Sequence, residues 1–362
     1  MRIVFDNIIF SLQKAGGISR YWSEIIKRLD LKDNNKLFYE HENDNIFRKE
    51  IHITTQKESS IKINILRYLP FLKKLPSKSI FHSSYYRVPL QKDVATIVTV
   101  HDFTYEYHRS GIAKYIHSFQ KNFAIKNADG VICVSESTKK DLCTFLPKID
   151  KSKIKIIYSS ASKEFHIVDD IKVKIKNTKF ESLTEKKIII YVGERKSSFK
   201  NFKIAVDTVA LLDNVVLVSV GSEEINKEEQ QLINNKLGDR FYHYRDISSV
   251  ELNKLYNISH CLIYPSSYEG FGIPVLEAMR AGCPVVSTNF SSIPEVAANA
   301  ALLVNSIDAN VFVNEIKKLD QVNFRNELIS KGLQQANKFS WDKCFDETYN
   351  FYQEVFNRKF NM

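Results

Sequence analysis

Long apolar runs are absent from this chain of 362 residues. A membrane-spanning helix needs about 18 or more consecutive apolar residues, and no stretch of the sequence approaches that length. The first segment, residues 1–6, reaches an acidic side chain at Asp6, which is too early for the apolar core of a secretory signal peptide. We therefore expect residues 1–6 to form the first core strand of a cytoplasmic protein.

The cysteine content is low and shows no pattern. The five cysteines are scattered and no Cys-x-x-Cys pair occurs; they are Cys133, Cys143, Cys261, Cys283 and Cys344. This spacing argues against a disulfide framework and against a zinc site, and it favours a reducing compartment. Three of them, Cys133, Cys261 and Cys283, lie in or beside apolar strands, where we expect them to pack as small apolar side chains.

Recognition motifs for nucleic acids are also missing. The net charge is +10, and a basic balance is compatible with nucleic acid, with an anionic membrane face or with an anionic substrate. No helix-turn-helix, RNP-like or zinc-finger pattern occurs. We therefore expect no nucleic-acid partner, and the positive charge leaves an anionic membrane or an anionic substrate.

A strand-then-helix rhythm runs through the chain twice, once in each half. Short apolar segments that end in polar or glycine-rich loops predict the strands, namely 80–82, 95–100, 130–134, 154–158, 187–193, 215–221, 260–264 and 284–287. Helices are expected over 112–127, 322–337 and 341–357, and the polar stretch 163–186 is expected to be a linker with the entry to the second half. This pattern predicts two α/β domains with parallel sheets.

The stretch 264–277 carries the strongest local signal. Glu269 and Glu277 bracket a loop that contains Gly270 and Gly272, and Pro274 follows at the start of a predicted helix. The glycines would allow the backbone to approach a phosphate closely, and the helix N-terminus would present N–H groups to an anion. The two carboxylates suit a ligand with many hydroxyl groups.

Three other loops follow predicted strands. Gly16 and Gly17 precede a helix, His101 ends the strand 95–100, and Arg195 and Lys200 follow the strand 187–193. Ligands of open parallel sheets bind at the carboxyl ends of strands, so in two facing domains these loops would line one cleft. Arginine and lysine can neutralise a pyrophosphate. A nucleotide-activated sugar is therefore the predicted ligand.

Each of these signals also has a purely structural interpretation. Arg195 and Lys200 could be surface charges, and Glu277, if it lies in the first turn of its helix, could favour the helix dipole. The glycine pair and His101 could serve the fold alone. Glu269 is harder to explain in this way, because no helix or ion pair calls for it between Tyr268 and Gly270. The conjunction of the loops carries the prediction.

Residues 61–78 mix basic and apolar side chains and contain no acid. One interpretation is a membrane-surface patch whose apolar side chains face the lipid and whose lysines meet lipid phosphates. The other is a core helix with a solvated basic face. Farther along, the spacing of Ser292 and Glu295, with Pro294 between them, predicts a capping box.

The motifs resemble those of the retaining GT-B glycosyltransferases of family GT4. The resemblance rests on Glu269 and Glu277 with Glu-Gly-Phe-Gly-Ile-Pro, together with four further segments that span nearly the whole chain: Gly-Gly-Ile-Ser-Arg-Tyr at 16–21, Val-Thr-Val-His-Asp at 98–102, Tyr-Val-Gly-Glu-Arg at 191–195 and Ala-Gly-Cys-Pro-Val-Val at 281–286. It implies two facing Rossmann-like domains and retention at the anomeric carbon. It also implies no obligatory metal or other cofactor, and no Asp-x-Asp triplet occurs in the sequence.

The resemblance also implies roles for individual residues. Glu269 and His101 would be the catalytic pair beside the sugar, and Glu277 would bind the ribose. The expected contacts with the donor diphosphate and sugar come from Gly16, Gly17, Arg195, Lys200 and from the backbone of Gly270, Phe271, Gly272 and Ile273. Without a metal, the charge of the leaving group would be met by the two cations and a helix dipole.

The implied domains are an acceptor-side domain over 1–165, a nucleotide-sugar domain over 166–340 and a helix over 341–362 that packs back on the first. The predicted function is transfer of mannose or another hexose from a GDP- or UDP-sugar to a glycan acceptor. That acceptor would be lipid-linked, in bacterial surface-polysaccharide synthesis (O-antigen, lipopolysaccharide or capsule), with the protein peripheral on the inner membrane face through residues 61–78. The alternatives are a non-catalytic sugar-nucleotide-binding protein and another GT-B enzyme such as an epimerase.

Overall fold

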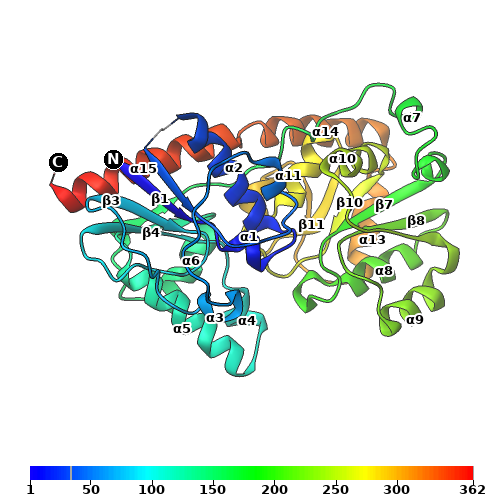
Figure 1. Ribbon diagram of the computed structural model, residues 1–362. Coiled ribbons are helices and arrows are strands. Elements are labelled where there is room, and N and C mark those ends of the chain that lie inside the picture. Colours follow the sequence, from blue (N-terminus) through cyan, green and yellow to red (C-terminus); the bar gives the residue numbers. More distant parts are fainter. Residues whose placement is uncertain (33–34, 362) are drawn as a thin grey trace. The chain divides into compact units, whose positions relative to one another are not determined.

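The computed structural model describes residues 1–32 and 35–361. The chain forms two compact units, Met1–Ser159 with Ser340–Met362, and Ser160–Phe339. Each unit is built on a six-stranded parallel sheet with helices packed on it (Figure 1). The predicted α/β class with parallel sheets is therefore confirmed.

The first unit has the strand order β2-β1-β3-β4-β5-β6. Its strands are β1 (Arg2–Asp6), β2 (Lys36–Tyr39), β3 (Ser79–Ser83), β4 (Val94–Val100), β5 (Gly130–Cys133) and β6 (Ile154–Ile156). Its helices are α1 (Ile9–Leu12), α2 (Gly17–Lys32), α3 (Ile63–Leu66), α4 (Thr104–His108), α5 (Gly111–Asn127), α6 (Glu136–Phe145) and α15 (Trp341–Phe360), with 3-10 turns η1 (Arg48–Glu50) and η2 (Lys151–Lys153). Ser135 caps α6 by accepting from the backbone N–H of Thr138.

The interior strands of the first unit, β1, β3, β4 and β5, are buried on both faces. Along β1, Ile3 and Phe5 belong to a cluster with side chains of α2 and α15, whereas Val4 belongs to a cluster with Phe71 and Leu75. This alternation follows the period of two of a strand. It explains why parallel strands appear in the sequence as continuous apolar runs.

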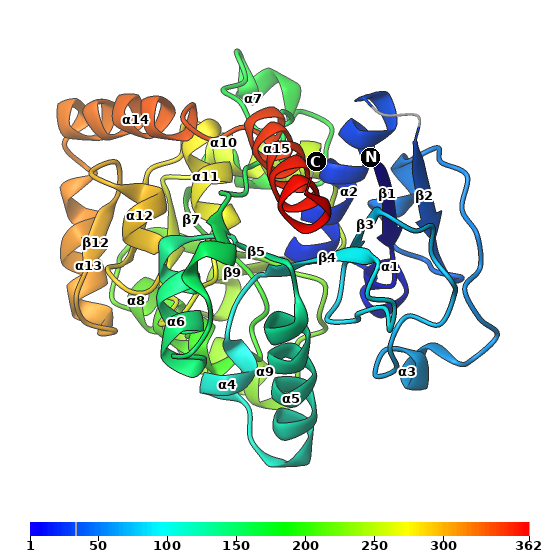
Figure 2. The ribbon, with the colours of Figure 1, turned by 90° about the vertical axis from the view of Figure 1, so that its left-hand side faces the viewer.

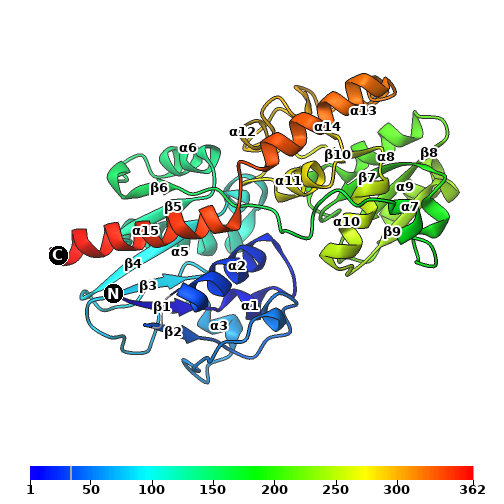
Figure 3. The same ribbon diagram turned by 90° about the horizontal axis from the view of Figure 1, so that it is seen from above.

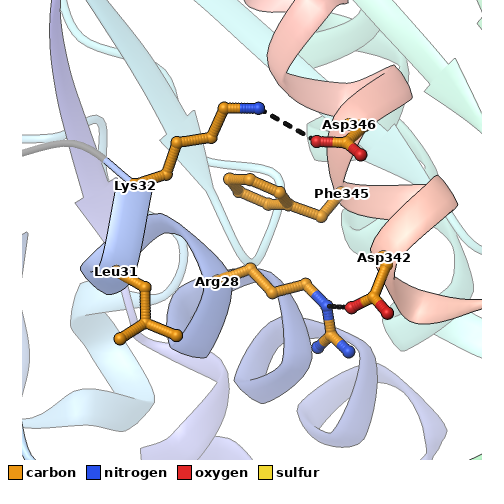
Figure 4. A pocket seen from close by; sticks show the side chains of 6 residues that line it. All are labelled: Arg28, Leu31, Lys32, Asp342, Phe345 and Asp346. Carbon is orange, nitrogen blue, oxygen red and sulfur yellow. Dashed lines mark hydrogen bonds and ion pairs between the residues drawn. The ribbon is translucent and has the colours of Figure 1, made fainter.

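Helix α15 completes this core. In Figure 3 it runs beside α2 across the strands of the first unit. Two ion pairs join the helices at their exposed edge, Arg28 Nε with Asp342 Oδ1 at 2.8 Å and Lys32 Nζ with Asp346 Oδ1 at 2.9 Å (Figure 4). Such exposed pairs contribute little, so the buried apolar side chains of α15 hold it in place.

The second unit has the strand order β12-β11-β10-β7-β8-β9. Its strands are β7 (Lys187–Val192), β8 (Val215–Val220), β9 (Phe241–Tyr244), β10 (Cys261–Tyr264), β11 (Val285–Thr288) and β12 (Leu302–Val304). Its helices are α7 (Ile171–Lys174), α8 (Phe202–Ala210), α9 (Lys227–Lys236), α10 (Ser249–Ile258), α11 (Ile273–Arg280), α12 (Ile293–Ala297), α13 (Ala309–Lys318) and α14 (Val322–Ala336), with η3 (Glu181–Leu183), η4 (Ser198–Lys200) and η5 (Gly238–Arg240).

Two segments differ from their sequence-based interpretation. Residues 61–78 do not form a core helix, because only the single turn of α3 is helical there. The stretch 163–186 is more than a linker, because four of its apolar side chains are buried in the second unit: Phe165, Ile175, Phe180 and Leu183. Within residues 1–32 and 35–361, no helix is long and apolar enough to cross a bilayer.

Candidate active site

Two neighbouring strands of the second unit carry the loops of interest. Strand β10 pairs in parallel with β7, with Cys261 opposite Ile189, so the loops after both strands emerge at the same sheet edge. The two loops are joined by hydrogen bonds: Ser267 N–H donates to the carbonyl of Phe199 at 2.7 Å, and Asn201 Nδ2 donates to the carbonyl of Pro265 at 2.9 Å. These hydrogen bonds hold the two loops against each other.

At this edge Lys200 and Glu269 form an ion pair. Lys200 Nζ lies 2.8 Å from Glu269 Oε1, and both side chains are mostly buried. The same ammonium lies 3.4 Å from the phenolic oxygen of Tyr264. Burial raises the pKa of Tyr264 well above its usual value, and the charge of Glu269 raises it further. Tyr264 is therefore a neutral hydroxyl beside this charge pair.

Two serines after β11 fix the backbone of Glu269. The carbonyl of Glu269 accepts from the hydroxyls of Ser291, at 2.5 Å, and Ser292, at 2.9 Å. The capping box predicted at Ser292 and Glu295 is wrong, because Ser292 makes no side-chain cap on α12. Its hydroxyl instead holds the loop that carries Glu269. The sequence did not indicate that either serine supports Glu269.

Helix α11 continues the loop that carries Glu269. It begins after Gly272, whose φ of 98° is a left-handed conformation that glycine adopts without strain. The helix ends with N–H bonds from Gly282 to Met279 and from Cys283 to Ala278, the pattern of a Schellman motif. The first turn of the helix leaves backbone N–H groups without helical partners, and these lie directly after Gly270 and Phe271.

Glu277 lies in the second turn of α11. The first turn contains no acid, so the interpretation of Glu277 as a first-turn charge that favours the helix dipole is wrong. The hydroxyl of Tyr256 donates to Glu277 Oε2 at 3.4 Å. Burial, followed by the charge of Glu277, raises the pKa of Tyr256 well above its usual value. Tyr256 thus orients this carboxylate from α10.

Arg195 is held by a set of partners that the sequence did not indicate. Its side chain has no exposed surface. One guanidinium nitrogen lies 3.0 Å from His243 Nε2, the other donates to the carbonyl of Glu223 at 2.8 Å, and Nε lies 3.5 Å from Glu229 Oε1. Burial lowers the pKa of His243, and the charge of Arg195 lowers it further. His243 belongs to β9, which the sequence did not predict.

The glycine pair of the first unit lies at the start of α2. Gly17 is the first helical residue, and the carbonyl of Gly16 accepts from the N–H of Arg20 at 2.9 Å. The side chain of Gln13 accepts from the N–H of Ser19 at 3.4 Å. A Cβ at position 16 would lie 2.8 Å from Gln13 Oε1, and a movement of this flexible side chain would relieve the contact.

His101 follows β4 in the first unit. Its ring meets Tyr21 edge-on, with the ring centroids 5.0 Å apart. Burial lowers the pKa of His101 to about 4, against the opposing charge of Asp102. The imidazole is therefore neutral near pH 7. The loop is held by buried Lys121, which donates to the carbonyl of Asp102 at 3.2 Å.

The predicted site residues thus divide between the units. The second unit brings Lys200 and Glu269 into contact and places Arg195, Glu277 and the backbone of residues 270–273 on the loops and helices around the same sheet edge. Gly16, Gly17 and His101 belong to the first unit. Among the residues that the structure describes, no group of three or more His, Cys, Asp or Glu side chains could hold a metal ion.

Comparisons with known proteins define the class. The family "Glycosyl transferases group 1" matches residues 173–335, and "Glycosyltransferase Family 4" matches residues 15–161. The O-antigen chain mannosyltransferase RfbU of Salmonella typhimurium is 30% identical over 259 residues, which are 70% of this chain and 68% of the relative. The chain belongs to the group 1 glycosyltransferases of the GT4 type, and it is a glycosyltransferase.

A second relative matches over a shorter stretch. The O-antigen chain mannosyltransferase B of Escherichia coli is 41% identical over 105 residues, which are 28% of this chain and 27% of that protein. The serotype-specific mannosyltransferase WbdA of Escherichia coli is 25% identical over 230 residues, 60% of this chain and 28% of the relative. The printed names describe the activities of those two relatives. The match with this chain spans about a quarter of the length of each.

Solved structures share the fold. Sucrose-phosphate synthase from Thermosynechococcus elongatus superimposes with a TM-score of 0.76 at 18% identity and covers 99% of this chain and 100% of its own. The Anabaena protein HepE, in complex with UDP-glucose, gives a TM-score of 0.76 at 15% identity over 98% and 100% of the chains. WaaG, described as a glycosyltransferase of lipopolysaccharide biosynthesis, gives 0.71 at 12% over 99% and 100%. The predicted GT-B fold is confirmed.

Proposed function

We propose that this glycosyltransferase transfers a mannosyl residue from a nucleoside diphosphate sugar to a hydroxyl of a glycan acceptor. The transfer retains the anomeric configuration and contributes to a bacterial surface polysaccharide of the O-antigen type. The names of three relatives, all mannosyltransferases, support the sugar. The UDP-glucose complex of HepE supports a nucleotide-sugar donor. The acceptor in this proposal is lipid-linked.

The observation that carries the proposal is the contact between Lys200 and Glu269 at 2.8 Å. A cation and a carboxylate at one sheet edge, beside the N-terminus of α11, match the two parts of the proposed donor. Lys200 meets the negative charge that develops on the diphosphate as the glycosidic bond breaks. Glu269 accepts hydrogen bonds from sugar hydroxyls, and its backbone is fixed by the two serines after β11. The backbone N–H groups of residues 270–273 add donors for the phosphates.

The other site residues take supporting roles in this proposal. Glu277, oriented by Tyr256, binds the vicinal hydroxyls of the ribose. Arg195 contributes positive charge near the diphosphate from its buried position. From the first unit, Gly16 and Gly17 offer a close backbone approach to the phosphates, and neutral His101 donates or accepts a hydrogen bond at the sugar. The proposed reaction needs no metal or other cofactor.

A donor panel tests this function. The protein is incubated with GDP-mannose, UDP-glucose and UDP-N-acetylglucosamine, and the melting temperature is recorded, since a ligand of the native state raises it. Transfer to a water-soluble oligosaccharide acceptor is then followed by mass spectrometry, and the anomeric configuration of the product is read by NMR. GDP-mannose is expected to stabilise the protein most and to support transfer with retention. Transfer from another donor alone, or an inverted product, would contradict the corresponding part of the proposal.

We also propose that the protein works at the inner face of the cytoplasmic membrane and that residues 61–78 contribute to this contact. The structure divides the apolar side chains of this segment. Leu66, Phe71 and Leu75 are buried in the first unit, whereas four others are exposed: Ile61, Ile65, Tyr68 and Leu72. The segment contains no acid and presents lysines at its surface, which favours contact with anionic lipid.

A further inference from the structure

Helix α5 exposes a stripe of large apolar side chains. Ile112, Tyr115 and Phe119 are 77%, 72% and 74% exposed, and Ile116 and Phe123 are also exposed. Their spacing follows one face of an α-helix, and the rings of Phe119 and Phe123 stack with centroids 6.4 Å apart. Scattered exposed apolar residues are ordinary, but a continuous stripe marks an interaction site.

The opposite face of α5 fixes the direction of this stripe. His117, Lys121, Ala124 and Ile125 are buried against the unit. Lys121 Nζ forms a buried ion pair with Glu106 at 2.6 Å, and the ring of His117 stacks on Tyr105 with centroids 3.8 Å apart. A helix anchored in this way cannot rotate its apolar stripe inward. The exposed stripe is therefore a lasting surface of the folded unit.

Exposed apolar side chains of the 61–72 segment extend the surface. Gln120 Nε2 of α5 donates to the carbonyl of Arg67 at 2.5 Å, so this segment lies against the helix. Ile65 and Tyr68, on either side of Arg67, are exposed. Figures 1 and 2 show α3 and α5 below the sheet of the first unit, away from α2 and α15. We call the α5 stripe together with Ile65 and Tyr68 the apolar surface.

The two segments that form the apolar surface carry basic side chains and no acidic ones. Residues 59–92 and residues 107–128 contain no aspartate or glutamate. Seven basic side chains of these segments are well exposed: Lys62, Lys73, Lys74, Lys78, Lys92, Arg109 and Lys126. The two segments thus give the apolar centre an acid-free, basic rim. Its chemistry is complementary to a layer with an apolar interior and anionic headgroups.

We propose that the apolar surface docks on an anionic lipid bilayer, with the α5 stripe entering the boundary between headgroups and acyl chains. Phe119 and Tyr115 are suited to this depth, because aromatic rings favour the membrane interface. The rim lysines meet lipid phosphates. The inference extends the proposed membrane contact of residues 61–78. It rests on the proposed function, because a lipid-linked acceptor is the reason for the protein to bind a membrane. It assigns the larger part of the contact to α5.

A second copy of the chain is a less suitable occupant. In a two-fold interface the same patch faces itself, so the cations of the acid-free rim would meet one another. Like charges opposed across an interface are unfavourable. An anionic bilayer supplies the opposite charge to the same rim, so charge complementarity selects the membrane.

Vesicle binding tests the proposal. The full chain is sedimented with vesicles of phosphatidylcholine alone and with vesicles that also contain phosphatidylglycerol. Binding to the anionic vesicles is expected, and it should weaken as salt is raised. The double variant Ile112→Ser/Phe119→Ser should bind about tenfold more weakly, because it removes two large apolar side chains from the contact. The matched control Val322→Ser removes a 68% exposed apolar residue from α14 and should bind as the wild type does.

Three results separate the inference from its alternatives. Absence of wild-type binding, or unchanged binding of the double variant, would overturn it. A concentration-dependent dimer in light scattering that the double variant loses, without vesicle binding, would assign the surface to a second copy and also overturn it. Transfer to the water-soluble acceptor should be equal in wild type and double variant. Absence of that transfer in both proteins would contradict the proposed function. Absence of vesicle binding with normal transfer would contradict only the proposed role of the apolar surface.

Discussion

Lys200 Nζ lies 2.8 Å from Glu269 Oε1, although 69 residues separate the two in the chain. The contact joins the loops after two adjacent parallel strands, β7 and β10. Each charge offsets the cost of burying the other. The pair therefore fixes both side chains at the sheet edge where the proposed donor binds.

The first prediction concerns the charge of Glu269. Glu269→Gln keeps the shape of the side chain and removes its charge. It should lower kcat about a hundredfold, because the amide accepts more weakly from the sugar hydroxyls and no longer holds Lys200 where charge develops. The melting temperature should fall as well, because Lys200, which is mostly buried, loses its counter-charge. Glu327→Gln, which alters an exposed ion pair with Lys331 on α14, is the matched control. Unaltered turnover of Glu269→Gln in a transfer assay would refute the proposed role.

The second prediction concerns Gly193, whose φ is 149°. A Cβ there would lie 3.2 Å from Lys200 Cδ, so Gly193→Ala should displace Lys200 and raise KM for the donor severalfold. Backbone strain should also lower the free energy of unfolding by about 1–3 kcal/mol. Gly238→Ala is strained as well, at φ 55°, but meets nothing within 4 Å. An equal rise in KM in both variants would show that strain alone is responsible.

The third prediction concerns a buried charge network in the first unit. Arg87 has no exposed side-chain surface and pairs with Asp6 at 3.0 Å and Glu58 at 2.7 Å. Burial raises the pKa of Asp6, although Arg87 opposes this effect. Arg87→Met should lower the free energy of unfolding by about 3–5 kcal/mol, because two carboxylates stay buried without their cation. Urea denaturation measures this loss.

The control for this network is an exposed pair. Lys172 lies 3.1 Å from Glu185, and both side chains are well exposed. Lys172→Met should leave the urea midpoint unchanged within error, because surface pairs contribute little. If Arg87→Met were as stable as this control, the network would not contribute to the stability of the first unit.

The fourth prediction concerns pH. Burial lowers the pKa of His82 to about 3, with a smaller contribution from His101. In the unfolded chain a histidine titrates near 6.5, so between these values the unfolded state binds more protons. Stability should therefore fall as pH drops from about 6.5 toward 3, by up to about 1.4 kcal/mol per pH unit for one such group.

Substitution of His82 isolates its part of this dependence. His82 Nδ1 lies 2.6 Å from the hydroxyl of Tyr352, and Nε2 lies 2.9 Å from Thr99 Oγ1. His82→Gln keeps a donor and an acceptor without the titration, so its unfolding free energy should depend less on pH between 4 and 6.5. His166→Gln, at an exposed position, controls for the substitution itself. An unchanged slope in His82→Gln would contradict the assignment.

The sequence predicts the central strands well and the edges poorly. The interior strands β7, β10 and β11 contain runs of apolar residues, because both of their faces are buried, and their positions were predicted. Strands β2, β9 and β12 were missed. All three lie at the edge of a sheet, where one side lacks a neighbour and the apolar pattern is weak. β9, for instance, is only partly buried along its length.

The same limit explains what was missed in the site. Lys200 and Glu269 stand out in the sequence because they follow the strong strand patterns of β7 and β10. The partners of Arg195 do not, since His243 comes from an edge strand and Glu223 contributes only its carbonyl. A serine hydroxyl has several possible partners. Without the fold, the hydrogen bond from Ser292 to the Glu269 carbonyl could not be distinguished from a helix cap at Ser292.

Helix α15 has a consequence for the order in which the protein folds. It fills the core of the first unit with Trp341, Phe345, Phe351, Tyr352 and Val355, yet its residues follow the whole second unit in the chain. During synthesis all residues of the second unit, Ser160–Phe339, are added before the first unit receives this wall of its core. Domains tend to fold as units during synthesis. The earlier half of the polypeptide can therefore complete its core only after the last helix has been synthesised.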